Sequence, residues 1–272
     1  MRTHYIIAFL LILASCHPKL SITEVGEWSI EAGQLAANGT AGDAMAEQYW
    51  DYVNALLPSD SLSQHIAFFV LYTDGPEEDL AGMSQFNHMY WKLELDTADI
   101  NLNHTDSAYV LEYHHTLIHE FGHLLTLNHH QITPTNDEYQ DDSKGYLTSE
   151  GYAKADSYLA QFINRFWPDS LLYEWDRADE VKAEKKRLKK LFAYYLKYAD
   201  RFPNSYAAES PEEDIAEAWT FFVLSNKPTA NDVMRQKVEF FYSYPELAAL
   251  REDIRKNMPF IPRDYLERFE RY

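Results

Sequence analysis

One segment of the sequence, residues 106–128, constrains the fold of this chain more than any other. Its apolar residues recur with the spacing of an α-helix from end to end. Within residues 117–125, every position except His119, Glu120 and His123 is uncharged, and most are apolar. This composition is typical of a helix inside a protein, where polar groups without partners are costly. We therefore expect a fold built around this helix, with a partner for its three polar side chains.

The order and spacing of these three side chains predict a metal site. Residues four apart lie on one face of an α-helix, so that His119 and His123 can bind the same ion. Glu120 then lies beside the ion and can take a proton from a metal-bound water, whose pKa zinc lowers towards about 7. Because the chain has one cysteine, thiolates cannot complete the site. Zinc held by histidine and carboxylate is the expected cofactor.

A catalytic zinc site needs a third protein ligand, and the sequence offers two. His129 lies six residues after His123 and resembles the third histidine of metzincins, but Thr126 replaces the glycine at which their helix breaks. The alternative is Glu213, at the start of a predicted helix that places Glu217 on the same face one turn later. A carboxylate beside a buried helix face needs a charge partner, which a zinc ion supplies. That requirement favours Glu213.

Two short blocks together resemble a known family. Residues 119–123 are HEFGH, and residues 205–218 contain SYA followed by ExxAEA. This arrangement resembles the gluzincins of the anthrax lethal factor catalytic domain family and the zinc-binding metallopeptidase lipoproteins of Bacteroidetes. The resemblance implies a zincin-like fold in which Glu213 is the third ligand, Tyr206 donates a hydrogen bond to the oxyanion and Glu217 holds a ligand histidine.

The amino terminus has the features of an export signal. Residues 6–14 form an unbroken apolar run that is too short for a membrane-spanning helix, which needs about 20 residues. The run ends in LASC, which resembles a bacterial lipobox. The resemblance implies a signal peptide over residues 1–15 and a lipid anchor on Cys16. His17 follows the cysteine in place of the aspartate that retains lipoproteins in the inner membrane, which favours the outer membrane or the cell surface.

Charge and length limit the class of protein further. The formal net charge is −19, so that the phosphates of a nucleic acid would repel the chain. The 272 residues, 46% of them hydrophobic, suffice for one large domain or two joined halves. We expect a tether over residues 16–30 and a catalytic domain over 31–272. In that domain, residues 31–130 hold a small sheet and the H-E-x-x-H helix, and 131–272 are all helical, which gives a predominantly helical α+β fold.

Local patterns predict the individual elements. Residues 66–73 are an apolar run typical of a buried strand, and the partial alternation of 89–96 indicates an edge or half-buried strand that a peptide substrate could pair with. Helices are predicted over 42–57, 149–167, 179–199, 211–224 and, in two pieces, 229–258. Near the site, His115 is interpreted as structural or as shaping the pocket, and Glu212 as part of a solvated first turn.

These features predict a lipid-anchored zinc peptidase that acts on peptides or proteins. Water activated by Glu120 would attack the peptide carbonyl, while zinc and Tyr206 stabilise the oxyanion. The alternative is a surface binding lipoprotein whose zinc is inert or structural. That protein would keep the ligands but would need neither Glu120 nor Tyr206, so that the presence of both favours the enzyme. No disulfide partner exists for Cys16.

Overall fold

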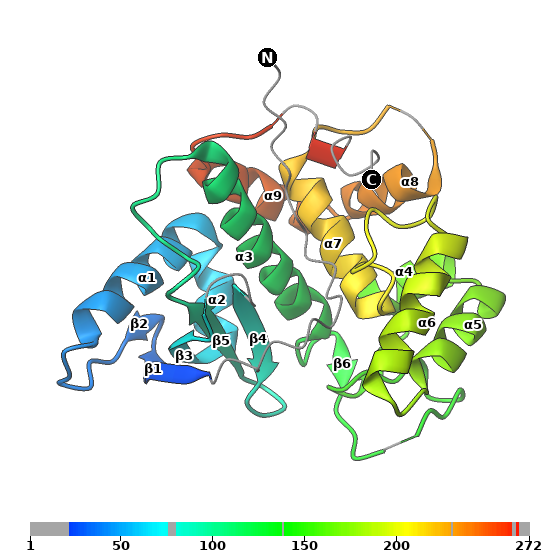
Figure 1. Cartoon of the computed structure of the whole chain (residues 1–272), viewed down its shortest axis with the longest axis horizontal. Helices are drawn as coiled ribbons and strands as arrows, with labels where there is room; N and C mark the ends of the chain where they lie inside the picture. The colour runs from blue at the N-terminus through cyan, green and yellow to red at the C-terminus, as the bar shows by residue number, and fades with distance from the viewer. Residues whose placement is uncertain (1–21, 76–79, 138, 230, 263–264, 267–272) are drawn as a thin grey trace.

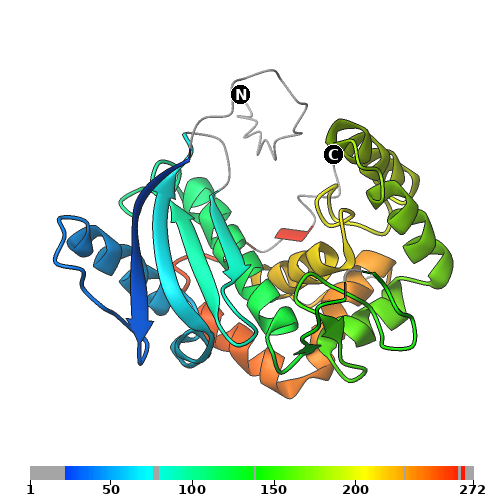
Figure 2. The same cartoon turned by 90° about the horizontal axis from the view of Figure 1, so that it is seen from below.

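The computed structural model describes residues 22–75, 80–137, 139–229, 231–262 and 265–266. The predicted signal peptide and Cys16 lie outside these residues. The sheet stands at one side of the molecule and a pair of helices, α5 (Asp169–Asp179) and α6 (Glu184–Lys197), at the other (Figures 1 and 2). Helices α3 (Ser107–Leu127) and α7 (Pro211–Leu224) lie between them. The predicted α+β class is confirmed.

The elements have the following bounds. The strands are β1 (Thr23–Glu31), β2 (Gln34–Leu35), β3 (Ile66–Thr73), β4 (Ala81–Gln85), β5 (Trp91–Asp96), β6 (Ile132–Thr133) and β7 (Tyr152–Ala153). The helices are α1 (Asp43–Leu56), α2 (Ser59–His65), α3 (Ser107–Leu127), α4 (Tyr158–Phe166), α5 (Asp169–Asp179), α6 (Glu184–Lys197), α7 (Pro211–Leu224), α8 (Val233–Phe240) and α9 (Pro245–Asn257), with a 3-10 turn, η1, at Phe241–Ser243.

Five strands form a mixed sheet in the order β2-β1-β3-β5-β4, in which only β3 and β5 run parallel. Trp28, Phe69 and Leu93 align across three of these strands and are buried on one face. The alternate positions point to the other face, where Lys92 forms an ion pair with Glu27. The buried face packs against α1 and α3 to form the core of this half of the molecule.

Of the two alternatives predicted for residues 89–96, the half-buried strand is confirmed and the edge strand is wrong, because β5 lies inside the sheet. β5 pairs with β3 on one side and with β4 on the other, so that β4 is the edge strand. An alternating pattern shows that a strand has one buried face, but it does not show whether both of its backbone edges are paired. β4 itself, with the sequence AGMSQ, has too few apolar or β-branched residues to be found by pattern.

The tether predicted over residues 16–30 is wrong from Thr23 onward, because that part of the chain is strand β1. β1 pairs with β2 and β3, and Trp28 is 1% exposed, with its indole N–H donating to Asp43 at 2.9 Å. Most other residues of β1 are polar or partly exposed, which is why the segment resembles a linker. The folded body therefore begins before residue 31.

The second half of the chain is mostly but not entirely helical. β6 pairs with β7, and the helix predicted over 149–167 begins only at Tyr158. Gly151 explains the difference, because its φ of +137° is outside the helical range and its position leaves no room for a side chain beside the carbonyl oxygen of Thr133. The helix predicted over 179–199 is α6, which follows the separate helix α5.

Candidate metal centre

Helices α3 and α7 pack side by side and supply the side chains of the centre. Their close approach depends on Gly122, the glycine within HEFGH. A Cβ atom at this position would lie 3.0 Å from Cδ1 of Trp219 and 3.2 Å from Cα of Ala216, both on α7. Because position 122 has no side chain, α7 can bring its carboxylates onto the histidines of α3.

Three of the predicted ligand atoms converge between the two helices. Nε2 of His119 lies 3.0 Å from Nε2 of His123 and 3.0 Å from Oε2 of Glu213, and the last two atoms are 3.3 Å apart. Ligands about 2.0–2.1 Å from a tetrahedral zinc ion are about 3.3 Å from one another. The three donor atoms are therefore spaced as a zinc ion would require, and the set contains two imidazoles and one carboxylate.

A fully buried carboxylate holds the first of these histidines. Oε1 of Glu217 accepts a hydrogen bond from Nδ1 of His119 at 2.9 Å, and Oε2 accepts one from the amide of Asn204 at 2.7 Å. This contact places a proton on Nδ1 of His119. In the neutral ring, Nε2 is then the nitrogen whose lone pair can bind a metal. In the described residues, Nδ1 of His123 has no hydrogen-bond partner, so that His119 is the better oriented of the two.

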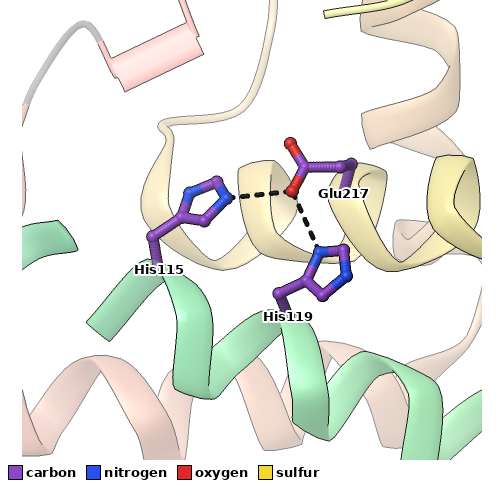
Figure 3. Close-up of side chains that lie close together, drawn as sticks. All are labelled: His115, His119 and Glu217. Carbon is purple, nitrogen blue, oxygen red and sulfur yellow. Dashed lines mark hydrogen bonds and ion pairs between the residues drawn. The ribbon is translucent and has the colours of Figure 1, made fainter. Parts of the chain in front are cut away.

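The same carboxylate takes part in a second group of possible ligands, shown in Figure 3. Nε2 of His115 lies 2.9 Å from Oε1 of Glu217, the oxygen that also contacts His119. His115, His119 and Glu217 are all buried, and this cluster could hold a metal ion. The group formed with Glu213 could do so as well and is more open, since the side chain of Glu213 is 22% exposed. A catalytic metal needs such an open side.

The electrostatics of the open group suit a cation. Burial by itself would lower the pKa of His119 and His123, but the neighbouring carboxylates outweigh it and raise both pKa values. Burial would raise the pKa of Glu213, but the two histidines outweigh it and hold this pKa well below its usual range. Each side chain is thus stabilised in its charged form by the others. A metal ion would supply to Glu213 the same positive charge that imidazolium supplies.

Glu120 lies beside the ligands and next to the edge strand. Its side chain is 8% exposed, and burial raises its pKa even though His123 and His119 act in the opposite direction. The backbone N–H of Met83 in β4 faces the carboxylate and partly offsets this rise of its pKa. Glu120 is therefore positioned between the ligand set and the free edge of the sheet.

Tyr206 approaches the centre from the loop before α7. Its ring centroid lies 5.4 Å from that of His119, and its hydroxyl interacts with the carboxylate of Glu213. Burial and the nearby carboxylates raise its pKa, so that it stays a hydrogen-bond donor at neutral pH. The side chain is nevertheless 38% exposed, which places it at the open side of the centre.

His129, the alternative third ligand, does not join the centre. Its ring packs against those of His65 and His130, with centroid distances of 5.5 and 3.9 Å. No group of converging ligand atoms in the described residues includes His129. The backbone explains this, because α3 continues through Thr126, whose hydroxyl donates to the carbonyl of Gly122 within the helix.

Sequence reasoning missed several contacts around the centre. Glu212 is not solvated: Tyr146 donates to it at 3.1 Å, and burial raises its pKa to about 7. Asn204 and Tyr265 were not identified, although Asn204 immediately precedes the SYA block. Tyr265 has no sequence signal, because it is 150 residues from the histidine that it contacts.

Comparisons with protein-family models, with curated proteins and with solved structures find no match for this chain. No helix in the described part of the chain has the length and apolar character needed to cross a membrane. The functional assignment therefore depends on the chemistry of the centre itself.

Proposed function

We propose that this chain is a zinc-dependent peptidase with a zincin-like fold. The observation that carries the proposal is the convergence of His119, His123 and Glu213, whose donor atoms are separated by 3.0–3.3 Å. Glu120 and Tyr206 beside this set favour catalysis over a structural metal, because a purely structural site needs neither an acid–base group nor an oxyanion donor. The open side of the set leaves room for water and substrate.

The mechanism assigns a separate task to each of these side chains. When bound, zinc supplies Lewis acidity that polarises the scissile carbonyl and acidifies water. Glu120 takes the proton of the attacking water and later delivers it to the leaving amine. Its raised pKa suits the first step, since a carboxyl group that binds its proton more tightly is the stronger base. Tyr206 donates a hydrogen bond to the oxygen that becomes negative in the transition state.

A peptide substrate would bind along β4. This strand has one edge paired with β5, and its other edge has no partner strand among the described residues. The N–H of Met83 that faces Glu120 lies on β4, so that a peptide paired with this edge would pass the ligand set. Strand pairing binds a substrate through the hydrogen bonds of its backbone. This mode of binding suits a peptidase, because its substrates share that backbone.

The proposal includes attachment to a membrane through a lipid on Cys16 after removal of residues 1–15, at the outer membrane or cell surface of a bacterium. Its support is the LASC sequence after the apolar run. Labelling cells with a radioactive fatty acid tests it: we expect label in the wild-type chain and none in Cys16→Ala. Equal labelling of both would contradict the anchor.

The catalytic proposal is tested by metal analysis together with digestion of a peptide library. We expect one zinc per chain in the wild type, and zinc without cleavage in Glu120→Gln. Glu112→Gln is the matched control, because it makes the same change on an exposed position of α3 and should cleave normally. Bound zinc without cleavage by the wild type would indicate the binding protein instead, and cleavage by Glu120→Gln would remove the assigned role of Glu120.

A further inference from the structure

Two adjacent histidines of α3 each contact a tyrosine hydroxyl, but only one of these pairs leads to the metal centre. The hydroxyl of Tyr52, on α1, bonds Nε2 of His114. The hydroxyl of Tyr265 lies 2.7 Å from Nδ1 of His115, whose other ring nitrogen bonds Glu217. The series of contacts Tyr265–His115–Glu217 continues to His119, and all four side chains are buried.

The chemistry of the acceptor sets the direction of each hydrogen bond. An ionised carboxylate only accepts, so that Nε2 of His115 and Nδ1 of His119 both donate to Oε1 of Glu217. In the neutral ring, Nδ1 of His115 is then an acceptor, and the hydroxyl of Tyr265 donates to it. The hydroxyl therefore selects the tautomer of His115 that anchors Glu217, and Glu217 selects the tautomer of His119 that turns Nε2 towards the metal.

Tyr265, the last residue in this series of contacts, belongs with Leu266 to a carboxyl-terminal segment, residues 265–266, that contacts the body of the molecule. Tyr265 is 3% exposed, and its ring centroid lies 5.6 Å from that of Phe221 on α7. The next residue, Leu266, donates its N–H to the hydroxyl of Ser225 at 3.1 Å. These contacts hold Tyr265 against both helices that carry the ligands.

We propose that His115 and Tyr265 are positioning residues for the metal centre, and that the carboxyl-terminal segment thereby sets its zinc affinity. The inference rests on the metal centre proposed above and adds to it a residue near the carboxyl terminus, Tyr265. Glu217 fixes His119 only if its Oε1 atom is itself held in place. His115 holds that atom, and Tyr265 holds His115.

The experiment measures zinc affinity of the full chain by competition with a chromophoric chelator, and the absorption spectrum of the Co²⁺ form as a report on ligand geometry. We expect Tyr265→Phe to weaken zinc binding by about 5-fold and His115→Leu by about 10-fold or more, near the lower end of the effect of outer-shell partners. His115→Gln keeps a donor for Glu217 and an acceptor for Tyr265, so that it should restore most of the affinity.

The neighbouring pair provides matched controls. Tyr52→Phe and His114→Leu make the same changes at the neighbouring pair, whose histidine is also buried on α3 but has no hydrogen bond to Glu217 among the described residues. These variants should leave affinity and spectrum unchanged. Equal losses in both sets, or no loss in Tyr265→Phe and His115→Leu, would overturn the inference alone, because the wild type still binds zinc. A wild type that binds no zinc would overturn the metal centre and the inference together. If His115→Leu does not fold, Tyr265→Phe still tests the inference, because it removes only a single hydroxyl and should fold.

Discussion

Helix α7 buries two carboxylates three residues apart, and their partners differ. Asp214 and Glu217 are both 0% exposed. Asp214 lies 2.6 Å from the ammonium of Lys237 and accepts from the indole of Trp167 at 2.8 Å. Glu217 contacts His119, His115 and Asn204 instead (Figure 3).

This difference in partners distinguishes Asp214, a carboxylate with a structural role, from Glu217, a carboxylate that orients a candidate metal ligand. The ammonium that neutralises Asp214 is itself buried and also donates to the carbonyl of Arg201 at 2.7 Å, so that this interaction ends within the helical half. The imidazoles around Glu217 each have a second nitrogen, which continues the contacts to Glu213 on one side and Tyr265 on the other. Burial depth alone would not distinguish the two carboxylates, whereas the chemistry of their partners does.

The largest expected effect comes from breaking the structural pair. Lys237→Met leaves Asp214 buried without its cation, which should cost about 3–5 kcal/mol of unfolding free energy. Zinc affinity of the folded protein should not change, since no ligand contacts Lys237. Urea unfolding and chelator competition measure the two quantities, with exposed Lys190→Met as the control. A parallel loss of zinc affinity would show that the two carboxylates form one unit.

His65, a histidine with no carboxylate partner among the described residues, extends the comparison through the pH dependence of stability. Burial, with His129 and His130 adding to it, lowers the pKa of His65 to about 4. The unfolded chain, with a pKa of about 6.5, then binds the proton first, so that stability is lost as pH falls from about 6.5 to about 4. The loss attributable to this residue is about 3 kcal/mol over that window. Unfolding at pH 7 and pH 4.5 should show a smaller difference in His65→Gln than in the wild type, and equal differences would contradict the assignment.

Glu217→Gln should show the opposite pattern to Lys237→Met. The amide keeps the shape of the side chain but removes the charge that holds the imidazoles, so that zinc affinity should fall about 10- to 100-fold. Unfolding of the metal-free protein should change by less than in Lys237→Met, because no buried carboxylate is left without its cation. Chelator competition and urea unfolding on the same samples make the test. An unchanged affinity would mean that Glu217 is as purely structural as Asp214.

The smallest expected effect concerns the contact that brings Glu213 and Glu217 to α3. Gly122→Ala adds a methyl group 3.0–3.4 Å from Trp219 and Ala216, and the overpacking, partly offset by better helix propensity, should cost about 1 kcal/mol. Glu213 should move with α7, so that zinc affinity also falls. Gly82→Ala is the control for stability, since nothing lies within 4 Å of the added atom. A stable variant with full zinc affinity would show that the helices have room to adjust.

Much of the centre was predictable because it depends on local geometry. The spacing of His119 and His123 places both rings on one face of any helix, and the same rule relates Glu213 to Glu217. The edge strand was not predictable, because β4 has a weak strand pattern and its place follows from pairing with β5. β1 was missed for a similar reason, since only pairing distinguishes a polar strand from a linker.

The sequence by itself determined the two helices that carry the candidate ligands and the face on which each candidate lies, because helical periodicity relates residues one turn apart. Only the tertiary structure decided that Glu213, and not His129, meets His119, because these residues are 94 positions apart and no local rule joins them. The packing of α7 at Gly122 brings Glu213 to His119, and the continuation of α3 through Thr126 keeps His129 away from it. The contact of Tyr265 with His115 is likewise tertiary, since it depends on where the carboxyl-terminal segment binds the body.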